Sequence, residues 1–286
     1  MTSGPRMENS KINAKLAAVL KPVQPTTRAA QFFEGFMAPW HGFQFIRRNP
    51  SLWPYAILAI VLNLLITTLV FIALVAAIAA IAVYVHPWFT QDQQGTLYWL
   101  WLTLDVLAAV MLFVLAVGTA MIMWKLLTGI LVGYQNGKLA AQTEILLGMN
   151  PEDITSITFF DEVADTFRML GSLLLTYFIF FLVGFIPIIG APIAIVGSTY
   201  RTWFLFGFDF IDYPLSLRGN RRADKYAFVR RYRAHTLGLG SAVVLLEFLP
   251  IVNSVLLTTA VIGAVIVNRR LESQPREDAT NHDALK

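Results

Sequence analysis

The sequence contains no cysteine and few charged residues. Without cysteine, its 286 residues cannot form disulfides or thiolate metal sites. Asp, Glu, Lys and Arg make up only 14% of the chain, against about 25% in typical soluble domains. The mean hydropathy is correspondingly high, at +0.60. This composition does not suit a soluble enzyme and is typical of a protein embedded in a membrane.

Common enzyme motifs are also absent from the sequence. The histidines lie far apart and lack zinc-site spacing, and no nucleotide-binding loop or nucleophile elbow is present. Gly238-Leu-Gly240 lies in apolar sequence and lacks the third glycine of a dinucleotide site, so we interpret it as a helix-packing position. We therefore predict no enzyme, no catalytic residue, no cofactor and no metal.

Long apolar runs dominate the sequence. Residues 52–85 carry no charge, and residues 97–132 carry only Asp105 and Lys125. About 20 apolar residues already cross a hydrocarbon layer about 30 Å thick. We therefore expect an all-α membrane protein with two long transmembrane helices, which must tilt or extend beyond the membrane.

Two further apolar blocks are interrupted near their middles. Residues 187–192 interrupt the block 169–211, and residues 250–254 interrupt the block 235–267. Neither interruption is charged, and each half of the last block spans only about 14 residues, or roughly 21 Å of helix. Re-entrant hairpins explain both facts. Full crossings joined by very short loops are the alternative, especially for the first block.

The remaining sequence forms tails, an aromatic segment and an insertion. Residues 1–28 and 272–286 predict disordered tails around a helical membrane domain, 29–271. Aromatic residues at helical spacing over 29–46 predict an amphipathic helix in the headgroup layer, or else a helix packed on a soluble face. Residues 138–168 predict a mostly acidic, helical cytoplasmic insertion. In it, Asn150-Pro151 predicts the start of a helix that continues into the third apolar segment.

Positive charge is confined to a few segments of the chain. Lys and Arg occur up to residue 48, beside the acidic insertion, over 215–233 and at the C-terminus, with Arg201 as the exception. The loop 86–96 and both interruptions have none. By the positive-inside rule, both termini face the cytoplasm, and we expect a multi-pass protein of the cell inner (plasma) membrane.

Ionisable side chains in apolar sequence are the first candidates for function. A charge near the bilayer centre costs at least about 2.5–3.5 kcal/mol and normally faces a partner or water. Arg201 and Glu247 are therefore expected to line a solute pathway. Asp209 and Asp212 share a helix face and either line the pathway or end a helix.

Two further candidate sites each allow a functional and a structural interpretation. Asn253 and Ser254 lie near the start of the last half-helix, where they offer a buried anion site or simply cap the helix. A basic cluster between residues 218 and 233 either attracts anions or, as we favour, anchors the protein to anionic lipid. It consists of Arg218, Arg221, Arg222, Lys225, Arg230, Arg231 and Arg233. Nucleic acid is not an expected partner.

Several motifs, in their order along the chain, resemble one family. They are Gly35-Phe36 to Gly42-Phe43, Asn49-Pro50, Phe185-Ile186-Pro187, Asp212-Tyr213-Pro214 and Leu249-Pro250-Ile251-Val252-Asn253. Over about residues 32–272 the chain is similar to the CysZ-type sulfate permeases and the related etoposide-induced membrane proteins. The resemblance implies two crossing helices, two half-penetrating hairpins, a homo-oligomer and sulfate uptake, and it favours re-entry.

The sequence departs from the permeases at two places. It reads Ser51-Leu52-Trp53 where they tend to have a Gly-Leu-Arg anion-binding turn, and it has Glu247 where they are apolar or hydroxylic. Both differences disfavour sulfate. Arg47 and Arg48, just before the turn, are the candidates to replace the missing arginine.

The sequence therefore predicts a permease or channel-like protein for a small inorganic anion, sulfate by resemblance, with a pore shared between subunits. Basic residues would concentrate the anion and half-helix starts would replace its hydration. Glu247 is the candidate proton-linked group. The alternative is a stress-related membrane scaffold that transports nothing.

Overall fold

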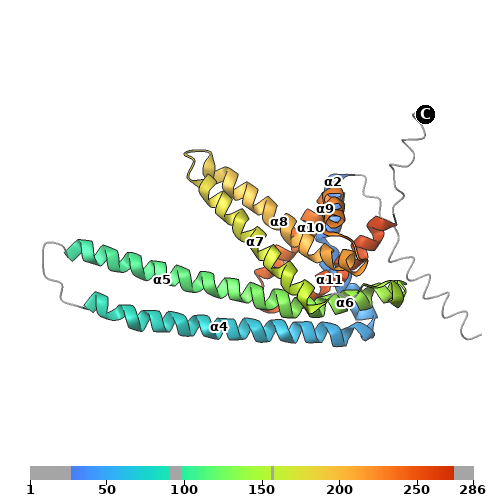
Figure 1. Ribbon diagram of the computed structural model, residues 1–286, viewed down its shortest axis with the longest axis horizontal. Coiled ribbons are helices and arrows are strands. Elements are labelled where there is room, and N and C mark those ends of the chain that lie inside the picture. Colours follow the sequence, from blue (N-terminus) through green and yellow to red (C-terminus); the bar gives the residue numbers. More distant parts are fainter. Residues whose placement is uncertain (1–26, 91–97, 156–157, 274–286) are drawn as a thin grey trace, which may run out of the picture.

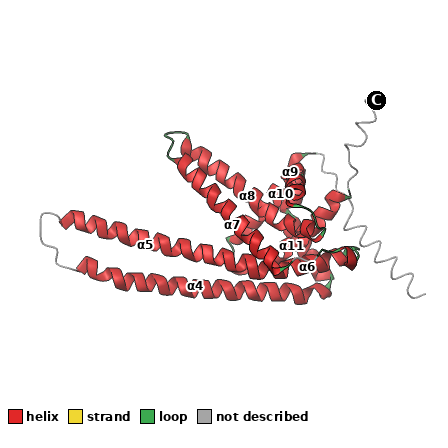
Figure 2. Cartoon of the chain, viewed as in Figure 1, coloured by secondary structure: helices red, strands yellow, loops and turns green. Residues whose placement is uncertain are grey.

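The computed structural model describes residues 27–90, 98–155 and 158–273, and these residues form helices without a strand (Figures 1 and 2). The helices are α2 (Arg28–Phe36), α3 (Ala38–Arg48), α4 (Trp53–Thr90), α5 (Tyr98–Leu127), α6 (Gly133–Leu146), α7 (Phe159–Gly184), α8 (Gly190–Leu217), α9 (Arg222–Arg231), α10 (Arg233–Glu247) and α11 (Pro250–Glu272). The all-α membrane architecture is confirmed. The predicted tails fall almost entirely outside the described residues.

Helices α4 and α5 form a long hairpin that projects from the body of the molecule (Figure 1). They contain 38 and 30 residues, or about 57 and 45 Å. The α4 surface is apolar and open, with Ile57, Leu69 and Val83 exposed by 49%, 57% and 76%. Four helical segments within the described residues are long and apolar enough to cross a membrane. They are Pro50–His86, Tyr98–Leu146, Phe159–Gly184 and Ser254–Glu272.

The ends of these two long helices differ from the expected boundaries. Helix α4 continues to Thr90, past the predicted start of the loop 86–96, whose remainder lies outside the described residues. Helix α5 does not end in water but passes through a π-helical turn, Thr128–Val132, into α6. The first part of the predicted insertion 138–168 is therefore a continuation of the second long helix.

Helices α7 and α8 form a second hairpin, which diverges from the first and whose tip stops short of the α4–α5 tip along the long axis (Figure 1). Its turn exposes Phe185 and Ile188 by 70% and 95%. Ile188 adopts a positive φ of 69°, and α8 begins at Gly190. An exposed turn of this kind, apolar and without charge, is suited to lipid or to another protein surface rather than to water.

Glycines bring the helices of the body into close contact. A Cβ at any of these positions would overlap a backbone carbonyl oxygen of the neighbouring helix. The pairs are Gly238 with Phe32 between α10 and α2, Gly240 with Trp203 between α10 and α8, and Gly42 with Thr259 between α3 and α11. The interpretation of Gly238 and Gly240 as packing positions is confirmed.

The aromatic segment 29–46 is not one helix but two, α2 and α3, which meet at Met37. Their small-residue faces pack on α10 and α11. Phe33 and Trp40 on the other side are exposed by 60% and 53%. Only the exposed aromatic face can therefore contact the headgroup layer, because the opposite face is part of the protein core.

The helix start predicted at Asn150 is wrong. Pro151–Asp153 forms a single 3-10 turn, after which the Thr155 N–H donates to the Leu217 carbonyl at the end of α8, 2.7 Å away. Helix α7 begins instead with a capping box between Thr158 and Asp161. The contact with α8 holds the chain extended where the local sequence favoured a helix.

Polar contacts fix how far the α10–α11 hairpin reaches along α4. Trp124 of α5 donates to Thr67 of α4 at 3.0 Å, and the neighbouring Lys125 contacts Glu247 at the end of α10. The hairpin tip is therefore level with Thr67, and Thr90 lies 23 residues, or about 35 Å, further along. With only 15 residues in α10, the hairpin covers part of the membrane helix, as a re-entrant segment would.

Candidate functional site

A charged pair lies where α5, α8 and α10 meet. The ammonium of Lys125 is 3.4 Å from the Glu247 carboxylate, and the two side chains are 23% and 22% exposed. The ammonium also lies 4.2 Å from the centroid of the Phe206 ring. Glu247 is the last residue of α10, where the helix dipole disfavours an acid. Lys125 offsets this cost.

The position of this ion pair along α4 indicates how deep it lies in the membrane. The lipid-facing apolar surface of α4 begins near Ile57, ten residues, or about 15 Å, before Thr67. Apolar residues such as Leu69 continue that surface beyond Thr67. The Lys125–Glu247 pair therefore lies within the apolar zone, where each charge needs a partner.

A polar cavity of about 250 Å³ connects Lys125 with the loops at the base of the α7–α8 hairpin. Its charged lining residues are Lys125, Asp161, Asp165, Asp209, Asp212 and Lys225. Asp212 pairs with Lys225 at 2.9 Å, whereas Asp209 forms no ion pair with any described residue. The structure thus brings Asp209 and Asp212 together in one cavity with Lys125, which also contacts Glu247. Asp165 pairs with Arg168 and Arg222 at 2.8 and 3.4 Å. Much of the cavity's negative charge is therefore offset, and Asp209 is the buried acid that can attract a proton or a cation.

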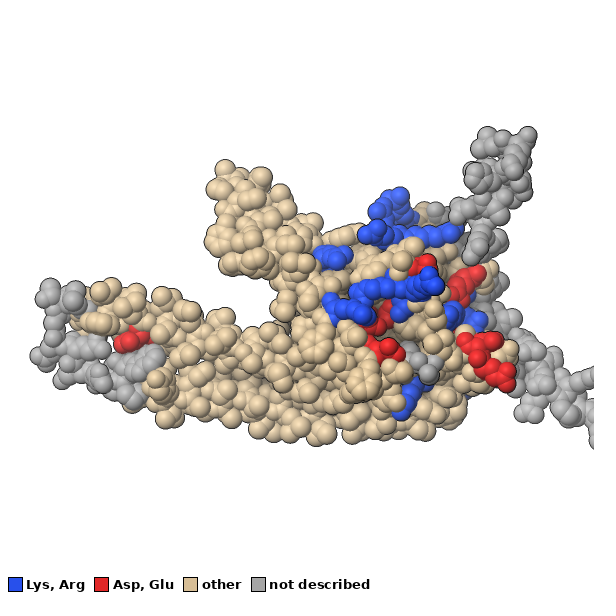
Figure 3. Space-filling model, in the orientation of Figure 1, with Lys and Arg blue, Asp and Glu red and all other residues tan. Residues whose placement is uncertain are grey.

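Arg201 lies in a different place from these acids. With Arg230 and Arg233 it lines a groove of about 560 Å³ whose other lining residues are Tyr200, Phe204 and Tyr226. Its guanidinium is 5.9 Å from the centroid of the Phe204 ring. The predicted pathway residue thus joins two arginines of the basic cluster predicted to anchor lipid. Figure 3 shows the basic side chains gathered on the body, whereas the visible surface of the two projecting hairpins is almost entirely uncharged.

Arg47 and Arg48 form a second positive site, at the C-terminus of α3. Both are exposed, and with Trp40 and Gln44 they line a groove of about 320 Å³ without an acidic residue. Arg47 lies 5.8 Å from the centroid of the Phe43 ring. The position at a helix C-terminus favours cations, and the chain then turns through Pro50–Leu52 into α4.

The candidate site at Asn253 and Ser254 differs from expectation. Helix α11 begins at Pro250 with Leu249 as its N-cap and no side-chain cap, so the capping role is wrong. Ser254 is buried, and its hydroxyl accepts a hydrogen bond of 2.8 Å from the Asn63 amide of α4. The side chain of Asn253 lies outside the part of the chain that the structure describes.

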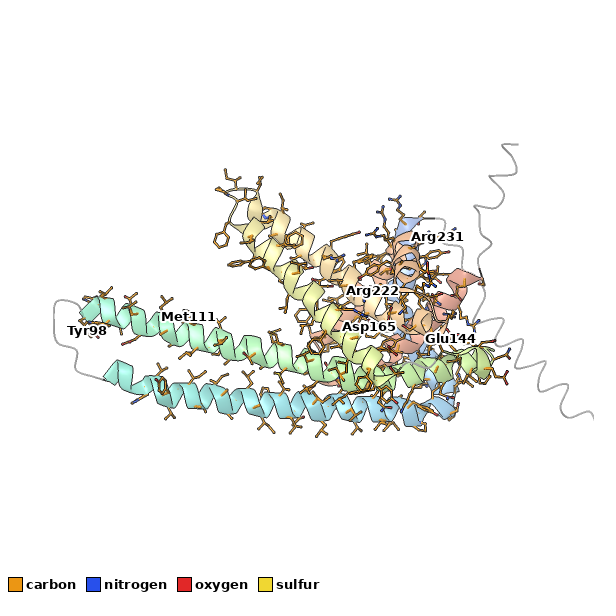
Figure 4. The ribbon with its side chains drawn as sticks, viewed as in Figure 1. Tyr98, Met111, Glu144, Asp165, Arg222 and Arg231 are labelled. Atoms are coloured by element: carbon orange, nitrogen blue, oxygen red, sulfur yellow. The ribbon has the colours of Figure 1, made fainter. Side chains whose placement is uncertain are left out.

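Two buried carboxylates of the body could not be found by sequence spacing. Glu144, which is 0% exposed, lies 2.7 Å from Arg218 and 2.6 Å from Arg269. Glu34 lies 3.2 Å from His235 and 3.3 Å from Arg270. These contacts join α6 to α8 and α11, and α2 to α10 and α11. Figure 4 shows Glu144 near the end of α6, far from the hairpin tips, so we interpret it as structural.

Comparison with known proteins matches the chain to a family and to a curated relative. The sequence profile of the family described as "Sulfate transporter CysZ/Etoposide-induced protein 2.4" matches residues 38–257. The sulfate transporter CysZ of Pseudomonas fluorescens (strain Pf0-1) is 25% identical over 176 residues. That match covers 59% of this chain and 66% of the relative, just under two thirds of its length.

Proposed function

This chain belongs to the sulfate transporter CysZ/etoposide-induced protein 2.4 family, and we propose that it forms a membrane pathway for a small anion, with sulfate as the first candidate. The family match covers most of the chain, and four described segments suit membrane crossing. The sulfate assignment rests on the name of a relative that is 25% identical. We place the protein in the inner membrane with both termini in the cytoplasm.

The observation that carries the proposal is the position of Arg47 and Arg48. Both side chains are exposed, no acidic residue lines their groove, and they directly precede the turn into α4. Two positive charges at the base of a transmembrane helix raise the local anion concentration. They lie just before the position at which the permeases tend to have the arginine of their anion-binding turn.

The apolar hairpins favour a pathway shared between subunits. Residues 169–200 carry no charge, and α4 has no Lys, Arg, Asp or Glu. One protomer alone therefore offers little on these surfaces to offset the dehydration of an anion. The starts of α8 and α11 supply the positive ends of two helix dipoles. A homo-oligomer would bring several such helix starts around one pore.

Lys125 and Glu247 provide a way to couple the anion to a proton. While Glu247 is charged, the Lys125 ammonium is neutralised by it at 3.4 Å. A proton on the Glu247 carboxylate removes one of the negative charges beside the ammonium and so reduces the repulsion of an approaching anion. The adjoining cavity, with Asp209 and Asp212, supplies a polar route for the proton from the cytoplasmic loops. In this mechanism one proton accompanies the anion.

The test is flux of radiolabelled sulfate into liposomes that contain the purified protein. We expect flux above that of empty liposomes, reduced about tenfold in the Arg47→Gln/Arg48→Gln variant. Arg221→Gln, which removes an exposed charge elsewhere, is the matched control. If sulfate and other anions enter no faster than into empty liposomes, the permease assignment is wrong and the membrane scaffold is favoured.

A further inference from the structure

Three arginines from three different helices line one groove. Arg201 comes from α8, Arg230 from α9 and Arg233 from α10. No acidic residue lines the groove, and none of the three guanidinium groups forms an ion pair with a residue in the described ranges. Like charges held together repel one another, so an anion in the groove would relieve this repulsion.

The other lining residues suit a ligand that is only partly polar. Tyr200 and Tyr226 present hydroxyl groups that can donate hydrogen bonds, and Tyr200 also offers an exposed ring. Tyr226 is fixed in place because its ring stacks on Phe208 with a centroid distance of 4.6 Å. Phe204 closes the groove beneath Arg201.

An apolar stripe on α8 leads from the hairpin tip into this groove. Ile193, Val196 and Tyr200 recur at helical spacing and are exposed by 49%, 70% and 48%. Tyr200 belongs both to the stripe and to the groove. The groove therefore lies where the apolar hairpin joins the basic body, which is the depth of a lipid headgroup.

We propose that this groove binds the phosphate of an anionic phospholipid, whose acyl chains lie along the stripe on α8. Guanidinium groups bind phosphate oxygens bidentately, and the cytoplasmic leaflet carries negative surface charge. A free sulfate or phosphate ion would use the arginines but leave the stripe uncovered. Arg201 then has a lipid-binding role distinct from the transport pathway. The bound lipid would hold the bundle of α8, α9 and α10 at the membrane surface.

Native mass spectrometry of the full-length protein in detergent tests the proposal. The probes are dioctanoyl phosphatidylglycerol, dioctanoyl phosphatidylcholine and inorganic sulfate. We expect one tightly bound phosphatidylglycerol and much weaker phosphatidylcholine. Arg230→Gln should weaken phosphatidylglycerol binding about fivefold, and Arg201→Gln/Arg230→Gln more strongly. Arg221→Gln removes a nearby exposed arginine outside the groove and should change the affinity less than twofold.

Three outcomes would overturn the proposal. Equal binding of the two lipids would show that the arginines do not recognise the anionic headgroup. Equal effects of Arg230→Gln and Arg221→Gln would show a diffuse charge effect instead of a site. Sulfate that displaces the lipid with comparable affinity would indicate a small-anion site. Thermal unfolding without lipid checks that each variant is folded. The result depends mainly on Arg230→Gln, because Arg230 is exposed and its substitution should leave the fold intact.

Discussion

Lys125 of α5 and Glu247 of α10 form an ion pair at 3.4 Å, although 122 residues separate them in the sequence. The pair joins the tip of the last hairpin to a membrane helix at the level of Thr67. The pair therefore positions the hairpin tip along α4. In the proposed mechanism it also gives the pathway a positive charge whose effect depends on a proton.

Glu247→Gln should remove the pH dependence of transport. In the proposed mechanism, protonation of Glu247 removes one of the negative charges beside Lys125, so flux in the unmodified protein should rise as the pH falls. The glutamine resembles the protonated state, so flux should stay at its low-pH level at every pH. The measurement is sulfate flux into liposomes as a function of pH, with Glu152→Gln at an exposed position as the control. A pH dependence that survives in Glu247→Gln contradicts the coupling mechanism.

Gly240→Ala should strongly destabilise the fold, because its Cβ would overlap the Trp203 carbonyl oxygen and the Gly207 amide nitrogen. We expect the free energy of unfolding to fall by about 3 kcal/mol or more. Gly171→Ala is the matched control, since a Cβ there meets nothing within 4 Å. It should be neutral or stabilising by up to about 1 kcal/mol. Thermal unfolding in detergent measures both variants, and equal melting temperatures would refute the close crossing of α8 and α10.

Glu144→Gln should cost about 3 kcal/mol of stability, because it leaves Arg269 without its buried carboxylate, whereas Arg218 keeps Glu272 at 3.2 Å. Glu152 lies in the same acidic segment but is exposed, so Glu152→Gln should have no measurable effect on stability. Chemical or thermal unfolding in detergent distinguishes the two. A Glu144→Gln protein as stable as the unmodified one would mean that α6, α8 and α11 are not held together by this carboxylate.

Stability should fall in acid through Glu34. Burial alone would raise the pKa of this carboxyl, but the hydrogen bonds and charges of His235 and Arg270 hold the pKa below its ordinary value of 4.5. The charged form is therefore favoured in the folded state. Its contribution is complete above about pH 4.5 and is lost as the pH falls through the lower, folded pKa. Melting temperatures from pH 6 to about 3 should decline less in Glu34→Gln; an unchanged decline would exclude this carboxyl as the cause.

Periodicity and length predicted the membrane helices because those properties are local. The apolar runs 52–85 and 97–132 became α4 and α5. The interruption expected at 250–254 lies slightly earlier, at Phe248 and Leu249, because Pro250 already begins α11. Local signals failed where a distant contact was stronger. The Asn150-Pro151 signal was overridden by the hydrogen bond from Thr155 to Leu217. The Thr158-x-x-Asp161 capping box was present in the sequence and would have given the correct start of α7.

The charged sites were predictable as residue types but not as pairs. Glu247 stood out as an acid in apolar sequence, but its partner Lys125 lies on another helix. Arg201 was separated in the sequence from Arg230 and Arg233, with which it shares a groove. Nothing in the sequence marks Glu34 and Glu144 as buried, because their partners are 74 to 236 residues away. Only the packing of α8, α10 and α11 brings these groups together.

Labelling of single cysteines tests the central claim, that both hairpins turn back within the membrane. The chain has no cysteine of its own, so Ile188→Cys and Phe248→Cys, at turn positions 95% and 78% exposed, can each be probed in intact cells with a membrane-impermeant thiol reagent. Tyr98→Cys, at the end of α5 that the proposed orientation places outside, is the positive control, and Arg221→Cys should react only after the membrane is permeabilised. We predict that neither hairpin cysteine reacts from outside, whereas labelling of either one as readily as Tyr98→Cys would show that its hairpin crosses the membrane fully.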